Sequence, residues 1–89
     1  MPEVRLVVTD PSGLHARPAA RFVQAASRFA SRIVIRQDGR EADAKSLIAI
    51  LGLTIRPSSE ITLASEGPDA DAAIAALEAE LAPYVSQPG

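Results

Sequence analysis

The chain has 89 residues, a formal net charge of −2 and a hydrophobic content of 47%, of which aromatic residues contribute only 3%. This length is enough for one small domain with a single core, which we expect over residues 1–89, but not for a deep pocket. The acidic balance argues against nucleic-acid binding. With no cysteine and one histidine, disulfides and thiolate metal sites are excluded, and we expect no metal and no cofactor.

No stretch of the sequence has the character of a membrane span. The N-terminus lacks a basic segment followed by an apolar run, so we expect no signal peptide. The longest apolar stretch, residues 47–55, is far shorter than the roughly 20 residues that cross a bilayer. We therefore expect a cytoplasmic protein without membrane insertion.

The first half of the chain predicts a strand, a helix and a hairpin. Apolar residues alternate over residues 4–8, which is typical of a half-buried strand, and residues 10–13 (Asp-Pro-Ser-Gly) favour a turn. From residue 16 to about residue 29 the apolar side chains share one helical face. Residues 33–36 predict a second strand, and the Asp-Gly pair that follows favours a tight turn into a third strand over residues 41–43.

The second half predicts two helices on either side of a strand. Ser46 is a candidate N-cap for a short helix over residues 47–51, which Gly52 is expected to end. Residues 61–63 predict the fourth strand. A last helix is expected from about residue 69 to residue 82, where a following proline stops it.

The predicted order is therefore β-α-β-β-α-β-α. Strands alternating with helices in so short a chain indicate an α+β fold with one antiparallel sheet and its helices on one face. We expect the last residues, 86–89, to form a disordered tail.

The only histidine, His15, precedes the first predicted helix by one residue and Arg17 by two. A lone histidine is most often a surface or capping residue. At a helix start, however, free N–H groups and the helix dipole favour an anion, and one ring nitrogen can point toward those N–H groups. A neutral imidazole can accept a phosphoryl group, and a planar guanidinium suits phosphate oxygens, so His15 and Arg17 are candidates for these two roles. Ser12 is a candidate turn former, a candidate helix cap or a hydrogen-bond donor to a phosphate, and we favour a structural role.

Ser46 has two interpretations. As an N-cap it needs no further function, but a phosphoserine at a helix start would also be well accommodated. Apolar residues of the short helix that point outward would form a patch suited to docking. The candidate docking residues are Leu47, Ile48, Leu51, Gln24 and Ala20.

Several segments carry a resemblance to a known family. They are Leu14-His15-Ala16-Arg17-Pro18-Ala19, Val23-Gln24 with Ala26-Ser27, Lys45-Ser46, Glu60-Ile61-Thr62 and the Ala-rich last helix. They are similar to segments of HPr, the histidine-containing phosphocarrier of the bacterial phosphoenolpyruvate-dependent sugar phosphotransferase system. The resemblance runs from Val4 to Leu81. It departs from the family at Arg56-Pro57-Ser58, where Ala-Lys-Gly is more usual.

The resemblance implies a fold, a reaction and partners. The family fold is an open-faced β-sandwich, in which three helices cover a four-stranded antiparallel sheet. The family role implies a carrier with a phosphohistidine intermediate rather than a turnover enzyme. His15 would accept a phosphoryl group on Nδ1 from phosphorylated enzyme I and pass it to enzyme IIA domains, with Arg17 steadying the group. Ser46 corresponds to the site of a regulatory serine kinase or phosphorylase in some relatives, and we expect a monomer.

Two other functions stay open at this point. A regulatory module, or a carrier of the nitrogen branch, would act through protein contacts and Ser46, although the presence of His15 and Arg17 weighs against pure regulation. A small ferredoxin-like nucleic-acid binder is disfavoured by the acidity of the chain and by its few aromatic residues.

Overall fold

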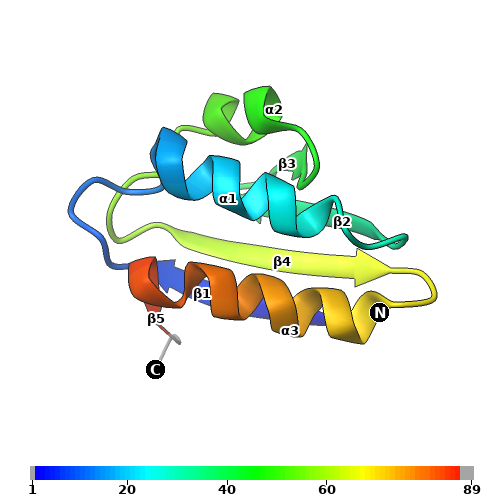
Figure 1. The fold of residues 1–89 in the computed structure, drawn as a ribbon. Coiled ribbons are helices and arrows are strands. Elements are labelled where there is room, and N and C mark those ends of the chain that lie inside the picture. The colour runs from blue at the N-terminus through cyan, green and yellow to red at the C-terminus, as the bar shows by residue number, and fades with distance from the viewer. Residues whose placement is uncertain (1, 87–89) are drawn as a thin grey trace.

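The computed structural model describes residues 2–86 and has the α+β architecture that the sequence predicts. Three helices cover one face of an antiparallel sheet, and the other face is left open (Figure 1). No helix in this part of the chain is long and apolar enough to cross a membrane. The elements are β1 (Glu3–Val8), α1 (Ala16–Ala26), β2 (Arg32–Gln37), β3 (Arg40–Asp43), α2 (Leu47–Gly52), β4 (Glu60–Glu66), α3 (Ala70–Leu81), a 3-10 turn (Ala82–Tyr84) and β5 (Val85–Ser86).

The sheet has five strands, in the order β3-β2-β4-β1-β5, rather than the four expected. The additional strand, β5, pairs with the end of β1. Just before it, the carbonyl of Tyr84 accepts hydrogen bonds from the backbone N–H groups of Thr9 (2.8 Å) and Asp10 (3.2 Å). Ser86 therefore belongs to a strand, and its assignment to a disordered tail is wrong. The rest of that expected tail, residues 87–89, lies outside the described residues.

The core lies between the sheet and the helices. Period-two alternation along the strands directs one set of side chains toward the helices, while α1 packs against both α2 and α3. Phe22 of α1 and Leu77 and Leu81 of α3 are fully buried against this layer. The strand residues that belong to this core cluster are Leu6, Val8, Ile33, Ile35, Ala42, Ile61 and Leu63.

Helix α1 ends at Ala26, three residues earlier than the apolar periodicity predicts. The next N–H groups, of Arg28 and Phe29, bond to carbonyls three residues back, so the last turn tightens. The carboxylate of Asp69, just before α3, then accepts hydrogen bonds from the backbone N–H groups of Ala30 and Ser31, each at 2.9 Å, and from the Ser31 hydroxyl. This long-range contact turns the chain away from the helix axis and into β2.

Helix α2 continues through Gly52, which was expected to lie beyond its end. The residue that takes the left-handed conformation is Thr54, with φ 54°. Its N–H bonds to the carbonyl of Leu51 at 3.2 Å and closes the helix. A β-branched residue is unusual there, because its side chain crowds the backbone when φ is positive.

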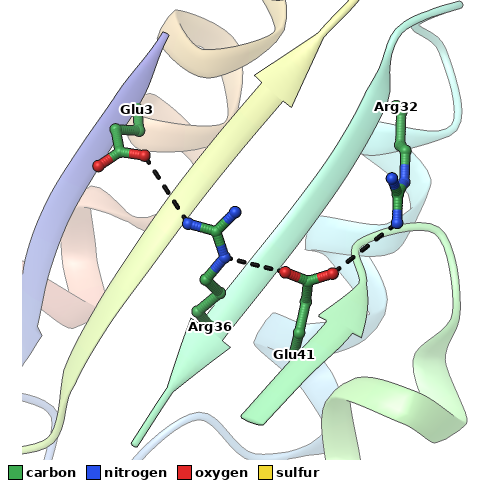
Figure 2. A network of polar contacts seen from close by, with 4 residues as sticks. All are labelled: Glu3, Arg32, Arg36 and Glu41. Carbon is green, nitrogen blue, oxygen red and sulfur yellow. Dashed lines mark hydrogen bonds and ion pairs between the residues drawn. The ribbon is translucent and has the colours of Figure 1, made fainter. Parts of the chain in front are cut away.

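The open face of the sheet is covered by ion pairs (Figure 2). Arg36 of β2 reaches over β4 to Glu3 of β1 (3.8 Å) and bonds to Glu41 of β3 (2.9 Å), and Glu41 also pairs with Arg32 (3.8 Å). The hydrogen bond that Arg36 donates to Glu41 and the attraction of Glu41 and Glu3 raise the pKa of Arg36. A single exposed ion pair of this kind contributes little to stability. In the network, however, each of these charged side chains has a partner of opposite charge.

The Asp69 contact predicts a pH-dependent contribution to stability. Hydrogen bonds from Ser31 and from the Ala30 N–H lower the pKa of Asp69. The contribution is therefore fully present above the unfolded-state pKa of about 4 and is lost as the pH falls through the lower folded-state pKa. Asp69→Ala should lower the free energy of unfolding at pH 7, as measured by urea denaturation. The difference in this free energy between the variant and wild type should disappear below about pH 4. Asp71→Ala, in the first turn of α3, is the control. A gap that persists at low pH, or an equal loss in the control, would contradict the assignment.

Candidate functional site

The β1–α1 and α2–β4 connections lie at the same end of the molecule, near β5 (Figure 1), and His15 is the last residue of the β1–α1 connection. Gly13 makes this possible with φ 65°, because a Cβ at that position would lie 2.4 Å from the carbonyl oxygen of Ile55. The same oxygen accepts a hydrogen bond from the N–H of Leu14 at 3.1 Å, and the side chains of Leu14 and Ile55 are both buried. The contacts of Gly13 and Leu14 with Ile55 therefore fix the backbone directly before His15.

His15 is itself the N-cap residue of α1, in extended conformation. Its side chain makes no capping hydrogen bond, so neither ring nitrogen bonds to the N–H groups of the first turn. The ring turns instead toward the preceding turn, where its Nε2 lies 3.9 Å from Oδ2 of Asp10. The imidazole is 46% exposed. The first-turn N–H groups of Ala16 and Arg17 have no intrahelical acceptor by their position and remain available to an anion.

Arg17 lies in the first turn of α1 and is exposed. Among residues 2–86 its guanidinium has no acidic or carbonyl partner, so its donors are available to phosphate oxygens. Ser12 is exposed in the turn before the helix, where its backbone N–H donates to Asp10 at 2.9 Å. Its hydroxyl does not cap α1, because His15 occupies the N-cap position. The turn role of Ser12 agrees with the structure, and the cap role does not.

Ser46 is the N-cap of α2, as the sequence predicts. Its Oγ accepts a hydrogen bond from the backbone N–H of Ala49 at 3.3 Å. Lys45 beside it donates from Nζ to the carbonyl of Phe29 at 2.7 Å, near the end of α1. The start of α2 is thereby tied to the α1–β2 connection, and Ser46 remains half-buried rather than enclosed.

The expected docking residues fall on α1 and α2 but differ in exposure. Ile48 is 85% exposed and Leu51 is 40% exposed, so both project from α2 as free apolar side chains. Leu47 and Ala20 are half-buried and Gln24 is exposed. Because α1 and α2 pack against each other, these residues come from two neighbouring helices of the layer that covers the sheet.

The geometry can be set beside known proteins. Residues 2–82 match the family model described as the PTS HPr component phosphorylation site. The chain belongs to the HPr family. It is 47% identical over 77 residues to the HPr-like protein Crh of Halalkalibacterium halodurans, which covers 86% of this chain and 92% of that protein.

Solved HPr-family structures have the same fold. The phosphocarrier protein of Mycoplasma superposes with a TM-score of 0.90 at 34% identity, covering 92% of this chain and 93% of that one. Crh of Bacillus subtilis, described as an intertwined dimer formed by domain swapping, superposes with a TM-score of 0.74 at 39% identity, covering 86% and 88%. The relatives thus include phosphocarriers and Crh proteins.

Two features of the site were not predicted from the HPr-like sequence motifs. One is the carboxylate of Asp10 beside the imidazole, because Asp10 reads as an ordinary turn residue and its proximity depends on the fold. The other is a row of cations on α1 and just beyond it. Arg17, Arg21 and Arg28 are exposed, and their side chains have no acidic partner among residues 2–86. Arg17 and Arg21 are four residues apart, and Arg21 and Arg28 are seven residues apart. Such spacings are typical of one helical face, so the sequence could have indicated this row.

The capping role of Ser46 leads to a stability prediction. Ser46→Ala should lower the free energy of unfolding by about 1 kcal/mol, because the N–H of Ala49 loses its acceptor. Ser46→Asp should retain most of the stability, since a carboxylate can accept the same bond and is favoured at a helix start. Chemical denaturation measures both, with Ser27→Ala, an exposed site after α1, as the control. An Ala variant as stable as wild type would contradict the cap.

Proposed function

We propose that this HPr-family chain accepts a phosphoryl group on Nδ1 of His15 from phosphorylated enzyme I and passes it to enzyme IIA domains during phosphoenolpyruvate-dependent sugar uptake. In the first step the bond between phosphorus and its carrier atom on enzyme I breaks as the bond to Nδ1 forms. The second step reverses this on the acceptor. The protein is a carrier with a phosphohistidine intermediate, acting in the cytoplasm.

The observation that carries this proposal is the exposed imidazole at the open start of α1. The ring leaves the first-turn N–H groups unoccupied, so these groups and the helix dipole can act on a phosphoryl group held beside them. The guanidinium of Arg17, which has no acidic partner among residues 2–86, adds a charge-assisted donor in the same turn. All three elements favour a dianion next to His15, and none encloses it, so a second protein can reach the group.

The surface around His15 supports protein partners. Ile48 and Leu51 offer an apolar contact, and the arginine row of α1 offers positive charge beside it. A partner with an apolar recess rimmed by acidic residues would match this surface, and the charges would steer its approach. We propose enzyme I and enzyme IIA as these partners, with the chain acting as a monomer. Sedimentation of the free protein would separate a monomer from a swapped dimer.

A regulatory role through Ser46 is the second candidate. It is supported by the position of Ser46 at the start of α2, where a phosphate is well accommodated, two residues before the exposed Ile48. A kinase acting there would place negative charge beside the docking patch and weaken contact with an acidic partner, and a phosphorylase would remove that charge.

One assay separates the two roles. Wild type incubated with phosphoenolpyruvate and enzyme I should gain the mass of one phosphoryl group, and the adduct should be labile in acid and stable in base. His15→Ala should fold normally and gain none, because the chain has no other imidazole. Ser46→Ala is the matched control and should be labelled like wild type. An acid-labile adduct on His15→Ala would overturn the proposed carrier site.

Arg17 should matter for transfer rather than for folding. Arg17→Lys retains the charge but loses the planar fork, so transfer to an IIA domain should slow by about tenfold with the melting temperature unchanged. Arg28→Lys, an equally exposed change near the end of α1, should transfer at the wild-type rate. Rapid-quench measurements give the transfer rates of both variants. Equal rates for Arg17→Lys and wild type would remove Arg17 from the site.

A further inference from the structure

The two nitrogens of His15 have different surroundings. Nε2 faces Oδ2 of Asp10 at 3.9 Å, and the Asp10 side chain is 25% exposed against 46% for the imidazole. Among residues 2–86, Asp10 is the one acidic side chain within 4.0 Å of the ring. A negative charge that is more sheltered than its neighbour therefore lies on one side of the imidazole.

The carboxylate of Asp10 is held in place by its own turn. Its Oδ2 accepts a hydrogen bond from the N–H of Ser12 at 2.9 Å, and its carbonyl accepts one from the N–H of Gly13 at 2.9 Å. Its N–H donates to the carbonyl of Tyr84 at 3.2 Å, which links the turn to the residue before β5. Three bonds thus fix the residue, and small motions of the exposed imidazole suffice to shorten the remaining distance, as catalytic hydrogen bonds commonly do when the reactants assemble.

We propose that Asp10 is a positioning residue for His15, which holds the proton of the neutral ring on Nε2 and leaves Nδ1 as the nucleophile. The inference rests on the proposed function. The tautomer of a histidine is set by the hydrogen bond that its other nitrogen makes, and a carboxylate that accepts from Nε2–H frees the lone pair of Nδ1.

The same carboxylate also acts on the product. When Nδ1 attacks phosphorus, the bond to the donor atom breaks with its electron pair, and the ring becomes positively charged because Nε2 retains its proton. Among residues 2–86, the charged residues next to His15 in the first turn of α1 or in the backbone that abuts Gly13 are Arg17 and Arg56, and both are cationic. Asp10 is the group that offsets the charge of the ring, as the buried aspartate of a serine-protease triad does for its imidazolium.

Two variants separate the charge of Asp10 from its part in the turn. Asp10→Asn keeps an oxygen that accepts from the Ser12 N–H but loses the charge, whereas Asp10→Ala loses both. We expect transfer from enzyme I to slow about two- to five-fold in Asp10→Asn, the range of an exposed ion pair, and at least as much in Asp10→Ala. Asp38→Asn, an exposed acid in the β2–β3 turn, should transfer at the wild-type rate. Wild-type transfer by Asp10→Asn would overturn the proposal and reduce Asp10 to a turn former.

The second measurement needs no phosphoryl donor. Long-range proton–nitrogen NMR spectra of the neutral ring should show the proton on Nε2 in wild type. The share of the Nδ1–H tautomer should rise about two- to five-fold in Asp10→Ala and stay unchanged in Asp38→Asn. An Asp10→Ala spectrum identical to that of wild type would overturn the positioning role. Failure of the proposed function is recognised separately, because wild type would then take up no phosphoryl group on His15 at all.

Discussion

The close approach of Gly13 to the backbone of Ile55 and Arg56 is the constraint on which the site depends. A side chain at residue 13 would collide with the Ile55 carbonyl, and the same carbonyl anchors the N–H of Leu14. Two connections far apart in the sequence are thus joined directly before α1. Because the helix begins at once after this junction, His15 has no freedom to become part of a longer loop. Its exposure and its place at the helix start both follow from that one contact.

The two faces of the molecule differ in how their charged side chains are paired. On the open face of the sheet, Arg36 and Arg32 are neutralised by Glu3 and Glu41, so little net charge is left to attract a partner (Figure 2). On the helical side, the arginines of α1 lack such partners among residues 2–86. Long-range attraction for an acidic surface therefore acts over α1, which begins directly after His15. An acidic protein would be drawn to α1 rather than to the sheet face with its paired charges, which favours productive encounters.

Local signals predicted most of the fold, whereas contacts across the chain decided what they missed. The strands, the α2 cap at Ser46 and the helix over residues 70–81 follow from periodicity and capping residues. The early end of α1 does not, because it depends on Asp69, nearly forty residues away. The fifth strand has only two residues and forms through pairing with β1. The position of Asp10 beside the imidazole was not predicted either, because it depends on how the turn over residues 10–13 folds.

In the proposed mechanism, Asp10 and Arg17 act on different ends of the bond between Nδ1 of His15 and phosphorus, and this division suits a carrier. A guanidinium attracts the phosphoryl oxygens and favours the loaded state, and the helix N–H groups add to this effect. The carboxylate acts on the ring, where it favours both the nucleophilic tautomer before attack and the charged ring after it. With each contribution near the size of one exposed ion pair, neither binds the group so tightly that transfer onward stops. An exposed site with weak, separate stabilising groups can therefore load and unload, whereas a buried site with strong ones would retain its phosphate.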